Sequence, residues 1–412
     1  MPAFRMLPLV LITTALFVVL SRFTVKNQTV TQSPIQSYSP PDRHGADFSW
    51  IQKLASIGDS YASGIGAGNR VEFHCSRYNN SYPYVLNSDG FLGRNSNRTH
   101  QNLACSGATT AAVVKKQIPA LDDDLDVVTV SAGGNDVGFI KFLNYCIYQF
   151  FVSSANDCEK VINNIWTKIE YELPANIAGL LDALKPKVEK KNGTILYTGY
   201  ARFFGIDDNT CDNVSWSVWD YESAAAKQYL TLERRKALND MTLAVNRRIK
   251  EAVEKAGPNV YYIDYDYYVA NSRGRYCEAG VIEPDPNRVG LQFYEWNAVD
   301  PGENETGLAK LGGKVPKGSF EGSIAQWVDK TLQEHPQWKF GPGKNERIVF
   351  NEKTLNLDDI KDAAIWVFPH LCRIFHPKPS LHWLIANLML DKIAKAAAER
   401  MESGRKRFGL EL

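Results

Sequence analysis

The chain has 412 residues, of which 44% are hydrophobic and 23% are charged, which suffices for one large core with a small appended unit. The formal net charge of +1 gives neither the basic field of a nucleic-acid-binding protein nor the acidic excess of a disordered one. A folded globular protein without a nucleic-acid partner is therefore expected.

The N-terminus carries an apolar run from Leu7 to Leu20. This run is shorter than the roughly 20 residues of a membrane span and is typical of a signal-peptide core. We therefore predict a signal peptide over residues 1–26. The alternative is an uncleaved anchor that holds the protein at a membrane, since Arg22 and Lys26 flank the run. The polar residues 27–48 predict a flexible linker.

Two further features agree with export from the cell. Possible glycosylation sequons of the form Asn-x-Ser/Thr begin at Asn27, Asn79, Asn97, Asn192, Asn213 and Asn304. The seven cysteines, which in an exported chain favour disulfides with one thiol left over, are Cys75, Cys105, Cys146, Cys158, Cys211, Cys277 and Cys372. We therefore predict a secreted glycoprotein with disulfide bonds.

Short β-branched or apolar runs then alternate with helical patterns. The predicted strands are residues 53–57, 101–104, 126–131, 194–198 and 260–263. Their continuous apolar runs are typical of parallel strands that are covered on both faces. Apolar residues spaced three and four apart predict helices over residues 224–256, around residues 161–169 before Pro174, and from Leu381 onward. The alternation predicts a three-layer α/β domain.

One long segment lacks this alternation of strand and helix patterns. Residues 278–362 are rich in Gly, Pro, Asn and Glu, with one predicted helix at residues 319–333. A segment of this length and composition indicates an insertion or lid subdomain. The α/β domain is therefore predicted to comprise residues 49–277 and 363–402, and residues 403–412 are predicted to form a solvated tail.

Four polar elements along the chain contain residues that could take part in catalysis. The first three are Gly58-Asp59-Ser60, Ser106-Gly107 and Gly133-Gly134-Asn135-Asp136, each near the end of a predicted strand. The fourth is Phe375-His376-Pro377, before the last predicted helix. Open α/β sheets bind ligands at the carboxyl ends of their parallel strands, so the first three elements are expected to meet there.

These residues match the requirements of ester hydrolysis. The Ser60 hydroxyl would attack an acyl carbon after His376 accepts its proton. The main-chain N–H groups of Ser60 and Gly107 and the side-chain amide of Asn135 would stabilise the oxyanion. The pattern predicts an acyl-enzyme mechanism with no cofactor and no metal. Asp59 and Asp136 are interpreted as residues that brace turns.

The ordered Ser, Gly, Asn and His elements resemble the SGNH, or GDSL-type, hydrolase superfamily, in particular its secreted esterase and lipase branch of bacteria and fungi. The likeness covers residues 54–277 and 373–398. It rests on Gly58-Asp59-Ser60-Tyr61-Ala62-Ser63-Gly64, on Cys75 and Tyr82-Pro83, on Ala104-Cys105-Ser106-Gly107-Ala108 and on Gly133-Gly134-Asn135-Asp136-Val137-Gly138-Phe139.

The resemblance implies a fold and a set of roles. The implied fold is a flavodoxin-like α/β/α sandwich with a mainly parallel five-stranded sheet, here with an irregular insertion. In the family, the positions that match Ser60, Gly107, Asn135 and His376 serve as nucleophile, two oxyanion donors and base. The branch also implies disulfides Cys75–Cys105, Cys146–Cys158 and Cys211–Cys277, with Cys372 outside them, although the sequence alone leaves the pairing open.

The chain departs from the family pattern around the histidine. Many members carry Asp three residues before it, where this chain has Arg373. In the secreted branch a main-chain carbonyl can orient the imidazole instead, so we predict a Ser–His dyad and name no catalytic acid. After His376 the family usually shows Asn and Gly, whereas this chain has Lys378 and Leu381, although His382 fits the pattern.

Other interpretations use the same residues or neighbouring ones. A secreted protein that binds lipid or glycan without catalysis is one alternative, and an acyltransferase is another. The run Gly64-Ile65-Gly66-Ala67-Gly68 imitates a dinucleotide loop, but the last glycine of that fingerprint is replaced by Asn69. The spacing of His370, His376 and His382 fits no compact metal motif. We expect a monomer that acts on a small-molecule, lipid or polysaccharide-linked ester.

Overall fold

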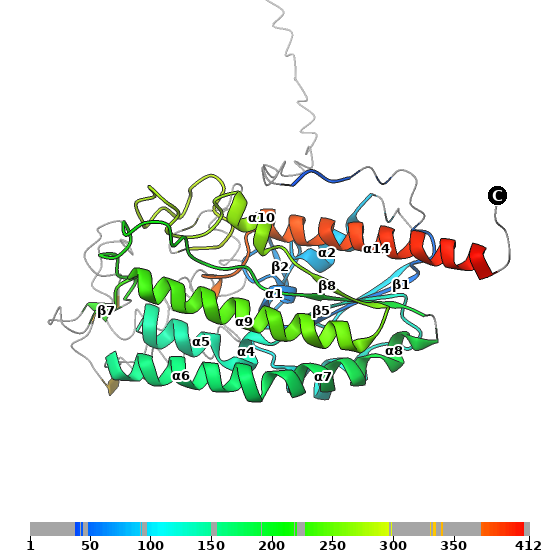
Figure 1. Ribbon diagram of the computed structural model, residues 1–412, viewed down its shortest axis with the longest axis horizontal. Coiled ribbons are helices and arrows are strands. Elements are labelled where there is room, and N and C mark those ends of the chain that lie inside the picture. Colours follow the sequence, from blue (N-terminus) through cyan, green and yellow to red (C-terminus); the bar gives the residue numbers. More distant parts are fainter. Residues whose placement is uncertain are drawn as a thin grey trace, which may run out of the picture. The chain divides into compact units, whose positions relative to one another are not determined.

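Five parallel strands form the central sheet of the part of the chain that the structure, a computed structural model, describes (Figure 1). The described residues are 38–41, 43, 48–90, 92, 97–149, 155–190, 192–217, 219–220, 227–295, 298, 330, 333–334, 339–340 and 372–407. All of them belong to one compact unit, Gln32–Leu412.

The sheet strands in chain order are β1 (Lys53–Gly58), β4 (Thr99–Asn102), β5 (Val127–Ser131), β6 (Thr194–Thr198) and β8 (Val260–Ile263). Their order in space is β4-β1-β5-β6-β8, with every neighbouring pair parallel. Strands β5 and β6 are buried along their whole length, as their continuous apolar sequences predict. The predicted α/β fold with a five-stranded parallel sheet is confirmed.

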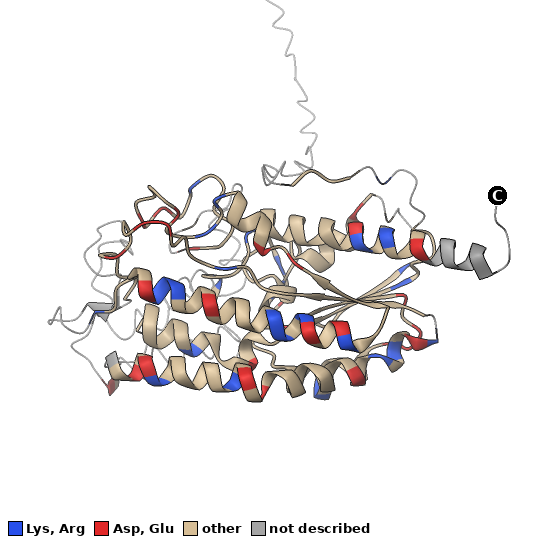
Figure 2. Ribbon diagram, in the orientation of Figure 1, with Lys and Arg blue, Asp and Glu red and all other residues tan. Residues whose placement is uncertain are grey.

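Helices cover both faces of the sheet (Figure 1). One layer contains α6 (Ala155–Tyr171), α7 (Leu173–Leu184) and α9 (Leu232–Ala256), which pack on one another. On the opposite side α14 (Pro379–Arg407) packs on α2 (Tyr82–Ser88). Figure 2 shows acidic and basic residues interspersed along the outer helices, whereas the sheet is almost free of charge. This is the three-layer arrangement expected from the alternating pattern.

Shorter elements connect these layers. They are α1 (Ser60–Ser63), β2 (Arg70–Glu72), β3 (Arg77–Tyr78), α3 (Thr110–Ala112), the π-helical turn Val113–Gln117, the 3-10 turn Ile118–Ala120, α4 (Gly134–Val137), α5 (Phe139–Phe142), the π-helical turn Leu143–Ile147, α8 (Pro186–Glu189), β7 (Trp219–Asp220), α10 (Asp266–Asn271) and β9 (Lys339–Phe340). The pairs β2–β3 and β7–β9 are antiparallel.

The start of the long helix differs from its prediction. The apolar spacing predicts a helix from residue 224, but α9 begins at Leu232. The main-chain N–H of Leu230 donates to the Val214 carbonyl at 2.8 Å, and the Thr231 side chain caps the helix by accepting from the Arg234 N–H. A tertiary hydrogen bond and a local cap therefore override the spacing.

Two predicted boundaries are also wrong in part. Residues 27–48 were expected to form a flexible linker, yet Tyr38 and Arg43 are buried. The Arg43 guanidinium pairs with the Asp391 carboxylate on α14, which also accepts from the Tyr38 hydroxyl at 2.7 Å. At the other end, α14 continues to Arg407, through residues predicted to be a solvated tail.

Several predictions lie outside the described residues. These are the signal or anchor at residues 1–26, most of the insertion at 278–362 with its predicted helix, and the sequons at Asn27 and Asn304. In the part of the chain that is described, no helix combines the length and apolarity needed to cross a membrane.

Candidate active site

The proposed nucleophile lies in a tight turn at the end of β1. The main-chain N–H of Asp59 donates to the Ser131 carbonyl at 2.8 Å, and the Asp59 carboxylate caps α1 by accepting from the Tyr61 N–H at 3.0 Å. Gly58 has φ +135°, and a Cβ there would lie 2.1 Å from the Ser131 oxygen. Glycine is therefore required for the turn that carries Ser60.

Asp59 braces this turn. Its carboxylate also accepts from the Ser131 hydroxyl at 3.0 Å and from the Tyr200 hydroxyl at 2.7 Å. Burial raises the pKa of Asp59 to about 6, and the hydrogen bonds from Tyr200, Ser131 and the main chain oppose this rise. The residue acts as a structural cap, in agreement with its interpretation as a turn-bracing residue.

Ser60 and His376 are in direct contact although they are far apart in the sequence. The Ser60 Oγ lies 2.7 Å from the His376 Nε2, and the His376 Nδ1 lies 3.1 Å from the Ile374 carbonyl oxygen. A carbonyl only accepts, so Nδ1 carries the proton and Nε2 is left to accept from the serine hydroxyl. This is the arrangement of a general base that is oriented by the main chain.

The loop that carries His376 is held by contacts on both sides. The Phe375 N–H donates to the Tyr294 carbonyl at 3.0 Å, and the Tyr294 N–H donates to the His376 carbonyl at 2.9 Å. The Tyr61 hydroxyl donates to the Phe375 carbonyl at 2.8 Å. Phe375 has φ +64°, which is uncommon for a side-chain-bearing residue. These contacts stabilise that backbone conformation and fix the ring of His376.

The surroundings of His376 keep its ring neutral. Removal of water by the surrounding protein lowers the pKa of His376 to about 4, and hydrogen bonds with the carbonyls of Ile374 and Arg373 partly oppose this change. At neutral pH the imidazole is therefore unprotonated and able to accept the serine proton.

The two other sequence blocks lie beside this pair. The Cys105 N–H donates to the Gly58 carbonyl at 2.9 Å, and the Asn135 side-chain N–H donates to the Ala108 carbonyl at 3.0 Å. The Gly107 loop thus contacts both the nucleophile turn and the Asn135 turn. The main-chain N–H groups of Ser60 and Gly107 have no acceptor among the described residues. They are available as donors to an oxyanion, as is the second amide hydrogen of Asn135.

Asp136 holds the Asn135 turn rather than the histidine. Its carboxylate accepts from the Thr110 N–H at 3.0 Å and from the Thr110 hydroxyl. Its main-chain carbonyl accepts from the Lys168 ammonium group at 3.3 Å. The residue therefore connects the Asn135 turn to α3 and α6.

Arg373 occupies the position where many family members have an acid. Its side chain is 2% exposed, and the guanidinium lies 4.4 Å from the centre of the Tyr294 ring and donates to the Ala298 carbonyl. His382 is also buried, and its Nδ1 accepts from the Tyr82 N–H at 3.2 Å. Burial lowers the pKa of His382 to about 3, so this ring is neutral and structural.

Disulfides support the loops around the site. The bonds are Cys75–Cys105, Cys146–Cys158 and Cys211–Cys277, the same pairs that the family resemblance implies. Cys372 is buried and takes no part in them.

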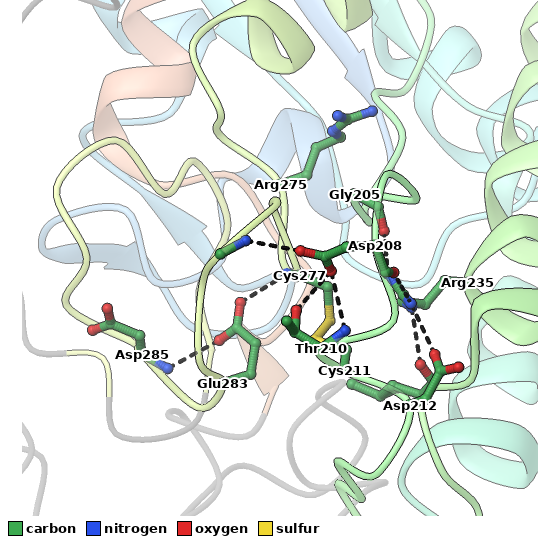
Figure 3. The surroundings of a disulfide bond; sticks show 12 residues. Gly205, Asp208, Thr210, Cys211, Asp212, Arg235, Arg275, Cys277, Glu283 and Asp285 are labelled. Atoms are coloured by element: carbon green, nitrogen blue, oxygen red, sulfur yellow. Dashed lines mark hydrogen bonds and ion pairs between the residues drawn. A yellow bond between two sulfur atoms is a disulfide. The ribbon is translucent and has the colours of Figure 1, made fainter.

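The third bond joins Cys211 to Cys277 within a network of hydrogen bonds (Figure 3). The Glu283 carboxylate accepts from the main-chain N–H groups of Cys277 and Asp285 at 2.8 and 2.9 Å. The neighbouring Tyr276 donates its hydroxyl to the Tyr294 carbonyl, which contacts the histidine loop. The disulfide thus anchors a segment that helps position His376.

The sequons that the structure describes are accessible to modification. Asn79, Asn97, Asn192 and Asn213 are all exposed. The described residues contain no cluster of three or more His, Cys, Asp or Glu side chains that could hold a metal ion.

Sequence reasoning missed three residues that hold the site. The Gln117 amide forms two hydrogen bonds with the main chain of Gly58, at 2.7 and 2.9 Å. Tyr61 contacts the histidine loop, and Tyr200 contacts Asp59. Tyr200 comes just after β6, so its place at the carboxyl end of a strand was a usable signal. The sequence held no such signal for Gln117 or for the role of Tyr61.

Comparison with known proteins agrees with this geometry. A family model described as the GDSL-like Lipase/Acylhydrolase family matches residues 56–281. The chain belongs to this family. The resemblance to the SGNH superfamily that the sequence blocks indicate is therefore confirmed.

Two lipases of this kind are related to the chain. Lipase 1 of Streptomyces coelicolor is 31% identical over 162 residues, which cover 39% of this chain and 56% of that lipase. A lipase of Streptomyces rimosus is 33% identical over 153 residues, which cover 37% of this chain and 53% of that lipase. The chain spans about half the length of the curated relatives it matches.

Solved structures with some likeness include a phospholipase A1 from Streptomyces albidoflavus, with 25% identity and a TM-score of 0.40 over 52% of this chain and 79% of that one. The extracellular lipase from Streptomyces rimosus gives 21% identity and a TM-score of 0.43 over 58% and 90% of the two chains.

Proposed function

We propose that this family member is a secreted serine hydrolase that cleaves carboxylic esters through an acyl-enzyme on Ser60. The observation that carries the proposal is the 2.7 Å contact between the Ser60 Oγ and the His376 Nε2, with Nδ1 directed at the Ile374 carbonyl. A serine hydroxyl is a weak nucleophile until a base accepts its proton, and this contact supplies the base.

The first half of the reaction forms the acyl-enzyme. The Ser60 Oγ attacks the ester carbon while its proton moves to the His376 Nε2. The Ile374 carbonyl accepts from Nδ1 and stabilises the imidazolium that results. The oxyanion is stabilised by the N–H groups of Ser60 and Gly107 and by the Asn135 amide. The imidazolium then gives its proton to the leaving alcohol, and the acyl group stays on Ser60.

The second half releases the acid. A water molecule gives a proton to the neutral Nε2 as its oxygen attacks the acyl-enzyme, and the same donors stabilise the second oxyanion. The proton returns to the Ser60 oxygen when the carboxylic acid leaves. No side-chain carboxylate is required, because the Ile374 carbonyl keeps the imidazole in the productive tautomer.

Secretion is supported by two observations. The apolar run at residues 7–20 predicts a signal peptide, and three disulfides suit an oxidising compartment. We also propose that the insertion at residues 278–362 acts as a lid that selects the acyl chain, apart from its described first part, in which Glu283 and Tyr294 support the histidine loop. Replacing residues 299–329 by a short linker should then change chain-length preference, and an unchanged preference would remove the lid from the proposal.

The test is hydrolysis of p-nitrophenyl esters from acetate to palmitate by the parent and by Ser60→Ala. Loss of the nucleophile should lower kcat by about 10⁴-fold or more. Ser63→Ala is a matched control, because Ser63 lies in the same turn α1 and is also buried. The Ser63 variant should keep its activity. A folded parent with no activity on any ester would favour a binding protein, and a fully active Ser60→Ala would exclude the acyl-enzyme.

The oxyanion site is tested separately with Asn135→Ala. Removing one such donor is expected to lower kcat by about 10²–10³-fold with little change in KM. Equal activity of parent and variant would remove Asn135 from the mechanism.

A further inference from the structure

One buried hydroxyl contacts both turns of the proposed active site. Tyr200 is 3% exposed, and its O–H donates to the Asp59 carboxylate at 2.7 Å. The same oxygen accepts from the Gly134 N–H at 3.1 Å. Asp59 directly precedes the proposed nucleophile, and Gly134 directly precedes Asn135. A single atom therefore joins the backbone that presents the nucleophile to the backbone that presents an oxyanion donor.

The Asn135 turn depends on an external partner of this kind. Helix α4 starts after Gly133, which has no side chain to cap the first N–H groups of the helix. Uncapped N–H groups in a buried helix end are unfavourable. The Tyr200 hydroxyl supplies the missing acceptor for Gly134, and the Asp59 carboxylate strengthens it, because an oxygen that donates to a carboxylate is a better acceptor.

The position of Tyr200 is itself determined by several contacts. Its main-chain N–H donates to the Asn246 Oδ1 at 2.8 Å, and the Asn246 side-chain N–H donates to its carbonyl at 2.6 Å. Its ring packs edge-on against Tyr61, with ring centres 5.1 Å apart. Helix α9 and the nucleophile turn thus hold the ring from two sides, so its hydroxyl is a rigid spacer.

We propose that Tyr200 is a positioning residue that sets the placement of Asn135 relative to Ser60. The inference rests on the proposed function, and it assigns to Tyr200 a role in forming the oxyanion site. Misplacing a catalytic group by about 1 Å can cost on the order of 10²-fold in rate, so the loss of one spacer bond is expected to be measurable.

The test is a double-mutant cycle with Tyr200→Phe and Asn135→Ala on a p-nitrophenyl ester. Tyr200→Phe keeps the ring and removes only the hydroxyl. It should lower kcat by about 10-fold to 10²-fold, with KM changed by less than about twofold, because the oxyanion forms only during the reaction. In the Asn135→Ala background the same change should have an effect below about threefold.

Tyr197→Phe is the matched control. Tyr197 is fully buried on the adjoining strand β6, and its hydroxyl donates to the Ala132 carbonyl at 3.0 Å. This variant loses a comparable buried hydrogen bond without touching Asp59 or Gly134, so it should lose similar thermal stability and keep its kcat. If Tyr200→Phe does not fold, the same double-mutant cycle is measured with Asp59→Asn, which weakens the same hydroxyl contact.

The possible failures are distinguishable. An active parent in which Tyr200→Phe keeps full kcat, or in which its effect is equally large without Asn135, overturns the role of Tyr200 and leaves the serine mechanism intact. A Tyr197→Phe variant that loses as much kcat also overturns it. A parent that is inactive on every ester overturns the proposed function and this inference together.

Discussion

Ser60 and His376 lie in two regions that are built differently. The nucleophile turn carries much of its support in its own sequence: Asp59 caps α1, and Gly58 permits the close approach to Ser131. Gln117 and Tyr200 add hydrogen bonds to Gly58 and Asp59 from other elements. The backbone of the histidine loop is held by Tyr294 and Tyr61, which are distant in the sequence.

This contrast bears on how the proposed dyad would work without a side-chain acid. A carboxylate brings its own charge and can orient a histidine from one position. The Ile374 carbonyl is neutral, so the orientation of His376 depends on the whole loop being rigid. The nucleophile turn should therefore tolerate changes elsewhere in the chain better than the histidine loop does.

The largest effect is expected from His376→Ala. Without the base, kcat should fall by about 10⁴-fold or more, and the double variant with Ser60→Ala should be no worse than either single variant, because the two residues act as a unit. Ester hydrolysis and circular dichroism of all three proteins measure this. Additive losses would show that the two regions act independently.

A second test places the aspartate that many family members carry at position 373 of the histidine loop. Arg373→Asp removes a buried guanidinium from the Tyr294 ring and places a carboxylate in the same buried position. The free energy of unfolding in urea should fall by about 3 kcal/mol, because an unpaired buried charge is costly. Arg373→Met, which keeps much of the volume, should lose less. Higher activity in Arg373→Asp at parental stability would show that this loop accepts a triad.

The pH dependence of kcat/KM separates the two regions by their titrating groups. His376 must be neutral to accept a proton, and its pKa is lowered to about 4, so activity should be constant at neutral pH and fall about tenfold per unit below pH 4. Asp59 has a pKa raised to about 6, so the profile is repeated in Asp59→Asn. The acid limb that remains belongs to His376, and a midpoint near 6.5 would contradict the lowered pKa of its ring.

The same two groups also make the stability of the fold depend on pH, in opposite directions. Unfolded His376 titrates near its ordinary pKa of 6.5 and the folded form near 4, so its contribution is complete above pH 6.5 and is lost as the pH falls toward 4. The raised pKa of Asp59 contributes stability below pH 3.8 that is lost as the pH rises through about 6. Circular dichroism at each pH therefore accompanies the rate profile.

The smallest effect is expected where the two regions touch. Tyr61→Phe removes the hydroxyl that donates to the Phe375 carbonyl and keeps the ring beside His376. A hydrogen bond of this kind contributes about 1 kcal/mol. We expect a loss of at most about fivefold in kcat, which is the factor that about 1 kcal/mol in the activation free energy gives. The matched change Tyr265→Phe affects a buried tyrosine whose hydroxyl has no partner among the described residues, and it should leave kcat unchanged. Equal kcat in the two variants would show that the histidine loop is rigid without Tyr61.

Much of the fold followed from the sequence because its strands are continuous apolar runs. β6 and β8 have the predicted bounds, and β5 differs by one residue. The start of α9 was wrong because the N–H of Leu230 bonds with Val214, a contact that no periodicity encodes. The prediction of a flexible linker around Tyr38 and Arg43 was wrong for the same reason, since their partner Asp391 lies near the other end of the chain.

The sequence by itself determined which candidate catalytic residues are present, in the Ser60, Gly107, Asn135 and His376 blocks. It also determined the glycine that the nucleophile turn requires and membership of the family. These depend on side-chain type and on turn preferences over a few residues, which a sequence records directly. Only the tertiary structure decided how His376 is oriented and which residue joins the two turns. Ser60 and His376 are 316 positions apart. The contacts of the Ile374 carbonyl and of the Tyr200 hydroxyl likewise could not be predicted from sequence spacing.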